Sequence, residues 1–123
     1  MSKLNHANLP VADVVALRDF FVQQFDYTLL SMRGENGFAV LRGTDGFILN
    51  IMRDNKGTGF PENFHVGFFL DTPDEVRAKH AQLTAANLNP GPVEELSRGG
   101  WRSLTFYCHA PNNILVEVGV GLS

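Results

Sequence analysis

Three side chains with metal-binding chemistry lie far apart in the sequence, each in a segment with the pattern of a β-strand. His6 and His65 each stand third in a short segment that opens such a strand, and Glu117 lies inside the apolar run 114–120. An ionised carboxylate is costly in an apolar strand unless a cation or hydrogen-bond donors meet it. Glu117 therefore indicates either a metal site or a salt bridge to an arginine of a neighbouring strand.

The composition is that of one domain that binds small molecules or other proteins. The chain has 123 residues, 44% of them hydrophobic, and a net charge of -3 with its ten Lys and Arg scattered singly. That pattern predicts neither a nucleic-acid surface nor a basic membrane surface. The one cysteine, Cys108, excludes an intrachain disulfide and favours the cytoplasm. No signal-peptide pattern opens the chain, and its apolar runs are shorter than the roughly 20 residues that span a bilayer.

The first half of the chain predicts a strand, a helix and three strands. Asp13 has the chemistry of a helix N-cap, and apolar residues follow it at helical spacing. Glycine-containing turns then separate three strand-like runs. The expected elements are a strand over 3–10, a helix with the apolar face Val14, Leu17, Phe20, Phe21 and Phe25, and strands over 27–33, 38–42 and 47–52.

The second half repeats this order after a polar segment over 54–62. Thr72, Pro73 and Glu75 predict a helix start, and the helix should end near Asn89-Pro90. Strands are expected over 64–70, 93–97, 101–108 and 114–120. The fold class is thus α+β, a single domain made of one βαβββ module over about 1–55 and another over about 62–123. If the modules pack around a pseudo-twofold axis, then His6, Asn50, His65 and Glu117 meet in one cavity.

This layout resembles the vicinal oxygen chelate superfamily, which includes glyoxalase I, fosfomycin-resistance transferases, bleomycin-resistance proteins and extradiol dioxygenases. The segment Ala110-Pro111-Asn112-Asn113 before the Glu117 strand is similar to the superfamily's Asp-Pro-Asp-Gly turn, with Ala for the first Asp and Asn for Gly. The resemblance implies two modules forming a cupped mixed sheet, a homodimer, and a metal held by His6, His65 and Glu117.

Asn50 stands where glyoxalase I carries a fourth ligand, a Glu implicated in proton transfer. A neutral amide cannot act as a general base, so glyoxalase I chemistry by that route is not expected. The remaining set of two His and one carboxylate suits Mn(II), Fe(II), Ni(II) or Zn(II) and leaves positions open for substrate. The resemblance then implies chelation of two neighbouring substrate oxygens by a lyase, isomerase or transferase. Extradiol dioxygenases commonly have longer chains with two module pairs.

Strand parity predicts which further residues line the cavity. Trp101 and Arg102 point to opposite faces, so one of them should line it: Arg102 would favour an anionic substrate, and Trp101 an aromatic or apolar one. Phe38 is a further candidate for the cavity wall. The predicted lining comprises Asn8, Ile48, Asn50, Met52, Phe69, Trp101, Arg102 and Leu115.

The remaining polar candidates have simpler interpretations. His80 lies among polar residues of the second helix and is expected to face solvent. His109, beside the Pro111 turn, is either a strand-end residue or one that reaches the cavity rim. Cys108 is expected to be a small buried hydrophobe.

Two other functions stay open beside the metalloenzyme. One is a binding protein like the bleomycin-resistance branch, which holds a drug or metabolite without chemistry. The missing fourth carboxylate and the altered turn favour it, while the metal triad counts against it. The other is an accessory domain with a relict site. The sequence specifies neither the substrate nor the metal.

Overall fold

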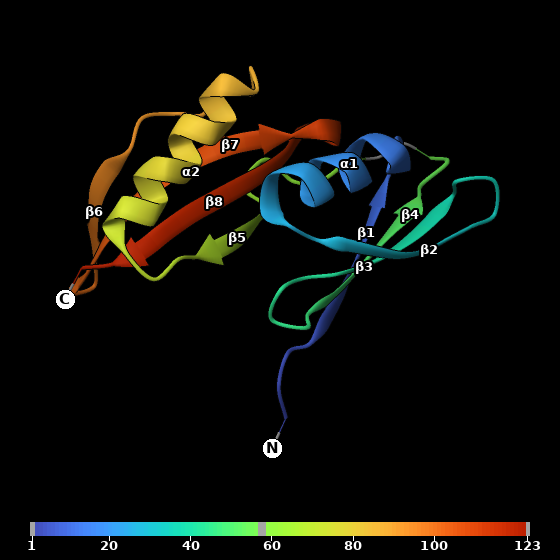
Figure 1. The fold of residues 1–123 in the computed structure, drawn as a ribbon, viewed down its shortest axis with the longest axis horizontal. Coiled ribbons are helices and arrows are strands. Elements are labelled where there is room, and N and C mark those ends of the chain that lie inside the picture. The colour runs from blue at the N-terminus through green and yellow to red at the C-terminus, as the bar shows by residue number, and fades with distance from the viewer. Residues whose placement is uncertain (1, 57–58, 123) are drawn as a thin grey trace. The chain divides into compact units, whose positions relative to one another are not determined.

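The computed structural model describes residues 2–56 and 59–122, and the chain divides into two compact units, one ending at Gly59 and the other beginning at Phe60. In each unit a strand leads through a helix into three further strands (Figure 1). The predicted α+β class with two βαβββ modules is therefore confirmed. The single-domain assignment stays a prediction, and each unit is described by itself.

The first unit forms a four-stranded mixed sheet with one helix. Its strand order is β1-β4-β3-β2, with β1 parallel to β4 and the other neighbours antiparallel. Apolar residues at helical spacing turn one face of α1 toward the sheet, and all five residues predicted for that face are buried. The elements are β1 (His6–Val11), α1 (Val14–Phe25), β2 (Thr28–Arg33), β3 (Phe38–Arg42) and β4 (Ile48–Arg53).

The second unit repeats this arrangement with the strand order β5-β8-β7-β6, and β5 runs parallel to β8. Its helix α2 contacts β7 and β8 (Figure 1). Phe106, Val116 and Val118 are buried on the helix side of these strands, so the alternating residues lie on the opposite face. The elements are β5 (His65–Phe69), α2 (Pro73–Ala85), β6 (Glu94–Arg98), β7 (Trp101–Ala110), the short 3-10 helix η1 (Pro111–Asn113) and β8 (Ile114–Gly121).

Both predicted helix caps are present. The Asp13 side chain accepts a hydrogen bond from the backbone N–H of Ala16 at 3.1 Å. Thr72 accepts one from the N–H of Glu75 at 3.1 Å, and its hydroxyl donates to the Glu75 carboxylate at 3.2 Å. Each cap gives a partner to a backbone donor that the first helical turn leaves free.

The second helix ends at Ala85, earlier than the Asn89-Pro90 signal predicted. Asn87 takes a left-handed conformation with φ of 61°. That bend lets the N–H of Leu88 donate to the carbonyl of Leu83 at 3.0 Å, which closes a Schellman motif. Neither α1 nor α2 is long and apolar enough to cross a membrane, and the described ranges contain no other α-helix.

The turn before β8 accounts for one departure from the superfamily's usual sequence. Asn112 and Asn113 both have positive φ, at 67° and 59°. Asparagine enters the left-handed region more readily than most residues that carry a Cβ. Asn113 therefore takes up the conformation that the usual glycine supplies, and Glu117 follows it on a regular strand.

Replacing Thr72 with Ala should lower the free energy of unfolding by about 1 kcal/mol, because the N–H of Glu75 loses its acceptor. Urea denaturation followed by circular dichroism measures the change. Thr84→Ala is the matched control, since Thr84 is an exposed threonine in the same helix and Ala favours the helix. Equal losses in the two variants would show that the cap is not the cause.

Candidate functional site

The face of the second sheet opposite α2, called here the site face, carries His65 and Glu117. Strands β5 and β8 pair in a register that sets His65 opposite Leu115 and Gly67 opposite Glu117. Residues paired across strands share a face, so all four belong to the site face. Nε2 of His65 lies 4.0 Å from Oε1 of Glu117. Two of the three predicted metal ligands thus lie side by side.

His65 is oriented by a backbone group. Its Nδ1 lies 3.1 Å from the carbonyl oxygen of Asn63. A carbonyl only accepts hydrogen bonds, so Nδ1 carries the hydrogen and Nε2 of the neutral ring keeps its lone pair. A hydrogen bond of this kind accompanies most metal-binding histidines. His65 therefore presents a nitrogen ligand on the side of Glu117.

Glu117 is held by a tyrosine. Its side chain is 22% exposed, and the hydroxyl of Tyr107, its partner on β7, donates to Oε1 at 2.5 Å. That hydrogen bond, then burial and the charge of Glu117, raise the pKa of Tyr107, while the Arg98 guanidinium opposes the rise. The alternative of an arginine salt bridge is wrong within the described residues, where no arginine pairs with Glu117.

The third predicted ligand, His6, begins β1 in the first unit. Its ring is exposed, and Nδ1 lies 2.8 Å from the side-chain oxygen of Asn5. With that oxygen as acceptor, Nδ1 carries the hydrogen and Nε2 keeps its lone pair. His6 and His65 therefore have the same arrangement, each within its own unit.

The residues predicted to accompany His6 share its face of the first sheet. The register of β1 and β4 sets His6 opposite Ile48 and Asn8 opposite Asn50, with Met52 two residues further along β4. The Asn8 amide nitrogen lies 3.0 Å from the Met52 sulfur. Phe38 pairs with Met52 from β3 and belongs to the same face. Asn50 thus lies beside another neutral amide.

The choice between Trp101 and Arg102 is decided by the register of β7. Tyr107 pairs with Glu117, so every second residue back to Trp101 shares the site face. Arg102 lies on the opposite face, where its guanidinium meets Glu95 at 3.2 Å. Of the two alternatives, Trp101 is therefore the one that lies on the site face. Phe69, 72% exposed on the site face, contacts Trp101 edge to face at 5.9 Å between ring centroids.

Sequence reasoning missed Tyr107, Arg98, Ser103 and Thr105, which all lie on the site face. A signal for Tyr107 was present, because Tyr107 and Glu117 lie at equal distances in sequence from Asn112 at the centre of the turn. A tight hairpin pairs such positions. Arg98 carried a similar signal, because Arg98 and Trp101 flank the two-residue turn Gly99-Gly100, and a hairpin of that kind pairs its flanking residues.

His80 does not face solvent as predicted. Its Nε2 lies 2.9 Å from the carbonyl of Gly91, and its ring contacts Phe106 edge to face at 5.1 Å. The reason is helical spacing, because His80 lies four residues after Val76 and three before Leu83, both of which are buried. His80 thus joins α2 to the loop before β6.

The two neighbouring residues of β7 lie on opposite faces. Cys108 is buried at 2% exposure, as predicted, and burial raises the pKa of its thiol. His109 is exposed on the site face opposite Leu115. His109 thus shares this face of the sheet with His65 and Glu117 but is not a predicted metal ligand.

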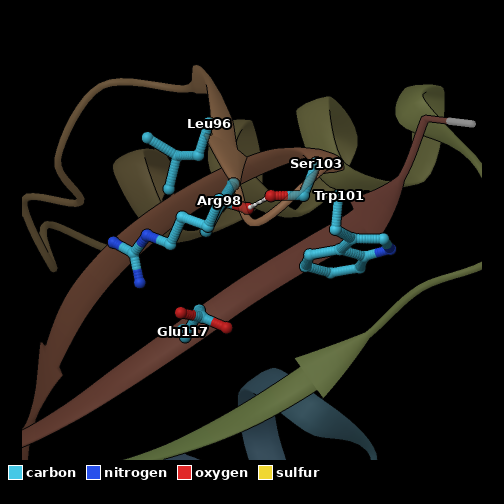
Figure 2. Close-up of a pocket in the computed structure, with 6 residues that line it drawn as sticks. Leu96, Arg98, Trp101, Ser103 and Glu117 are labelled. Carbon is cyan, nitrogen blue, oxygen red and sulfur yellow. Dashed lines mark hydrogen bonds between the residues drawn. The ribbon is translucent and has the colours of Figure 1, made fainter.

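A pocket of about 80 Å³ opens on the site face beside Glu117. Figure 2 shows side chains reaching it from three strands: Arg98 from β6, Trp101 from β7 and Glu117 from β8. Cationic, hydroxyl and indole groups thus gather next to one of the predicted ligands. The lining consists of Leu96, Arg98, Trp101, Ser103, Thr105 and Glu117.

The donor atoms fit a divalent transition metal. Metal–ligand distances for His and carboxylate are about 2.0–2.2 Å, so donors as close as Nε2 of His65 and Oε1 of Glu117 can reach one ion. No group of three or more His, Cys, Asp or Glu suited to a metal is found within residues 2–56 and 59–122. The pair in the second unit supplies two donors, and His6 belongs to the first unit.

Comparison with known families decides the assignment. The model of the Glyoxalase/Bleomycin resistance protein/Dioxygenase superfamily matches residues 3–118. The chain belongs to this superfamily. No curated protein is similar enough to count as a match.

Solved structures agree with the superfamily assignment. A possible glyoxalase from Bacillus cereus is 36% identical, with a TM-score of 0.82 over 96% of this chain and 98% of that one. The fosfomycin resistance protein FosX from Listeria monocytogenes is 20% identical, with a TM-score of 0.76 over 99% and 95%. Lactoylglutathione lyase from Agrobacterium tumefaciens is 16% identical, with a TM-score of 0.74 over 98% and 94%. The last two show the shared fold alone.

Glu117→Gln should lower the pKa of Tyr107 toward its ordinary 10.0, because a neutral acceptor replaces the carboxylate. A raised pKa means that folding favours the neutral phenol, so this stabilisation is present below pH about 10 and is lost as pH rises through the folded-state pKa. Tyrosinate absorbance during alkaline titration measures the shift.

The other tyrosine is the internal control for this titration. Tyr27 has a pKa raised by burial and by the charge of Asp45, so the Glu117 substitution should leave its titration unchanged. Tyr107→Phe assigns the two transitions. An unchanged titration of Tyr107 in Glu117→Gln would contradict the hydrogen bond.

Proposed function

We propose that the chain is a metal-dependent enzyme that binds a small substrate through two neighbouring oxygens. His6, His65 and Glu117 hold one divalent ion, of Mn, Fe, Ni or Zn. The observation that carries the proposal is the pairing of His65 with Glu117 on one face, with the lone pair of the His65 Nε2 free. Membership of the superfamily supports the same conclusion.

The ion would act as a Lewis acid on the substrate oxygens. The protein's own groups prepare the site for it. Tyr107 fixes the Glu117 carboxylate, and Asn63 and Asn5 fix the rings of the two histidines. Such supporting hydrogen bonds typically change metal affinity by about 10–100-fold.

The proposed reaction is a lyase, isomerase or transferase step. Asn50 stays neutral, so it can orient a substrate oxygen by hydrogen bonding but cannot remove a proton. The relative described as a possible glyoxalase supports an enzyme of this kind. We further propose a homodimer, in which a second copy completes or closes each site.

A second candidate is a non-catalytic protein that binds a drug or metabolite. The exposed aromatic pair of Phe69 and Trp101 favours it, because these rings offer apolar surface on the site face without any metal. Tight ligand binding by protein that takes up none of the four metals would favour this candidate over the enzyme.

His65→Ala and Glu117→Gln should each weaken divalent-metal binding by more than about 100-fold, since each removes a direct ligand where even supporting groups count for about 10–100-fold. His6→Ala should do the same. Elemental analysis of protein purified without chelator, then reloaded with each metal, measures the stoichiometry and affinity.

His109→Ala is the matched control, because it removes an exposed histidine from the same sheet face. It should keep about one ion per chain. Unchanged metal content in His65→Ala would remove His65 from the site, and absence of binding by any of the four metals would contradict the proposal as a whole.

Asn50→Glu should tighten binding of Mn or Ni by about tenfold or more, because it adds a carboxylate ligand for an octahedral ion. Asn55→Glu makes the same charge change at an exposed position outside the sheet and should have little effect. Equal affinity in Asn50→Glu and wild type would place residue 50 out of reach of the ion.

A further inference from the structure

The pocket beside Glu117 contains a cation without an ion pair. Arg98 is exposed at the end of β6 on the site face, and no carboxylate among the described residues pairs with its guanidinium. Its charge and a side-chain hydrogen bond both lower the pKa of Tyr107, so the guanidinium lies near the hydroxyl that holds Glu117 and keeps its other N–H donors for a ligand. Glu94 lies on the same face at the other end of β6, but this carboxylate does not line the pocket. Arg98 is therefore available to an anion.

Two buried hydroxyls provide a further donor. Ser103 and Thr105 are only 3% and 4% exposed, and their oxygens lie 2.8 Å apart. One hydrogen is used between them, while the other has no acceptor within the described residues, although both side chains line the pocket. The hydroxyl that does not donate to its neighbour can rotate its hydrogen toward the pocket, where it suits an oxygen acceptor on a ligand.

The pocket also has an apolar side. The Trp101 indole is 45% exposed, packs over Gly121 and contacts Phe69. The residues of β8 beyond Glu117 on this face are Gly119 and Gly121. A Cβ at Gly119 would lie 2.9 Å from Oγ1 of Thr105 and one at Gly121 3.6 Å from the indole, so these side chains cover the two glycines. The apolar side of the pocket is therefore the exposed part of the indole, on which a flat apolar group can stack.

We propose that this pocket binds the carboxylate of a small organic acid that also carries an aromatic or flat apolar group. Arg98 pairs with the carboxylate through its planar fork, and the Ser103–Thr105 pair donates to one of its oxygens. Trp101 and Phe69 hold the apolar group. The proposal rests on the proposed function only in that this ligand would be the substrate, or part of it, next to the metal ligands.

The test uses the fluorescence of Trp101, the one tryptophan in the chain. Phenylacetate is the probe, phenylacetamide its neutral counterpart and acetate its counterpart without a ring. Phenylacetate should change the fluorescence saturably and bind at least about tenfold more tightly than either counterpart. Titrations are run on protein as purified and after treatment with chelator, so that binding to a metal is separated from binding to Arg98.

Arg98→Gln should weaken phenylacetate binding by about tenfold and abolish its advantage over phenylacetamide. Arg102→Gln is the matched control, since it removes the same charge from the opposite face of the same sheet. Thr105→Val should weaken binding of the anion more than that of the amide. Equal affinities for acid and amide, or equal effects of the two arginine variants, would overturn the proposal.

The outcome is separable from that of the metal experiments. Loss of the Arg98 dependence with metal binding intact would remove the carboxylate subsite and leave the enzyme proposal standing. Arg98-dependent binding in chain that takes up no metal would support the subsite and contradict the metalloenzyme.

Discussion

The residues of the site face are arranged around the charge of the Glu117 carboxylate, which lies on β8 between β5 and β7. A half-buried charge needs hydrogen-bond donors or a cation, and Glu117 has Tyr107 on one neighbouring strand and His65 near it on the other. Arginine would have neutralised the charge, but His65 offers a nitrogen lone pair because its other nitrogen is bound to a carbonyl. The arrangement leaves the carboxylate ordered and still open to a metal ion, which is the property that the proposed function requires.

The parallel pairing of the first and last strands in each unit brings these residues together. His65 and Glu117 are far apart in sequence, yet the register of β5 with β8 sets them one strand apart on one face. In the first unit the pairing of β1 with β4 likewise sets Asn8 opposite Asn50 on the face of His6. Parallel strands need a long crossover, and α1 and α2 provide it while covering the opposite face. The open face is therefore a direct result of the module's connectivity.

Local patterns in the sequence predicted most of the fold, because caps, turns and apolar spacing act over a few residues. Asp13 and Thr72 cap their helices as predicted, whereas the end of α2 depended on the left-handed conformation of Asn87, which competes with the helix-forming alanines before it. Faces within one strand also followed from parity, as for Leu115 with Glu117. Parity does not give the register between strands, so the choice between Trp101 and Arg102 stayed open. Arg98 was missed because the pairing of Arg98 with Trp101 across the Gly99-Gly100 turn was not used.

The charges of the proposed site point to an anionic ligand from two independent directions. With the proposed ligands, two neutral histidines and one carboxylate would leave a divalent ion with one net positive charge, and Asn50 in place of a glutamate would preserve that charge. Arg98 adds a second positive charge at the pocket beside Glu117. In the proposed site the ion and Arg98 would together attract an organic acid, and the ion would also stabilise negative charge that develops on its oxygens. The exposed indole of Trp101 favours a flat group as the apolar part of such a ligand. Residues on the three adjacent strands β6, β7 and β8 would thus select the ligand by the charge of its acid group and by the shape of its apolar group.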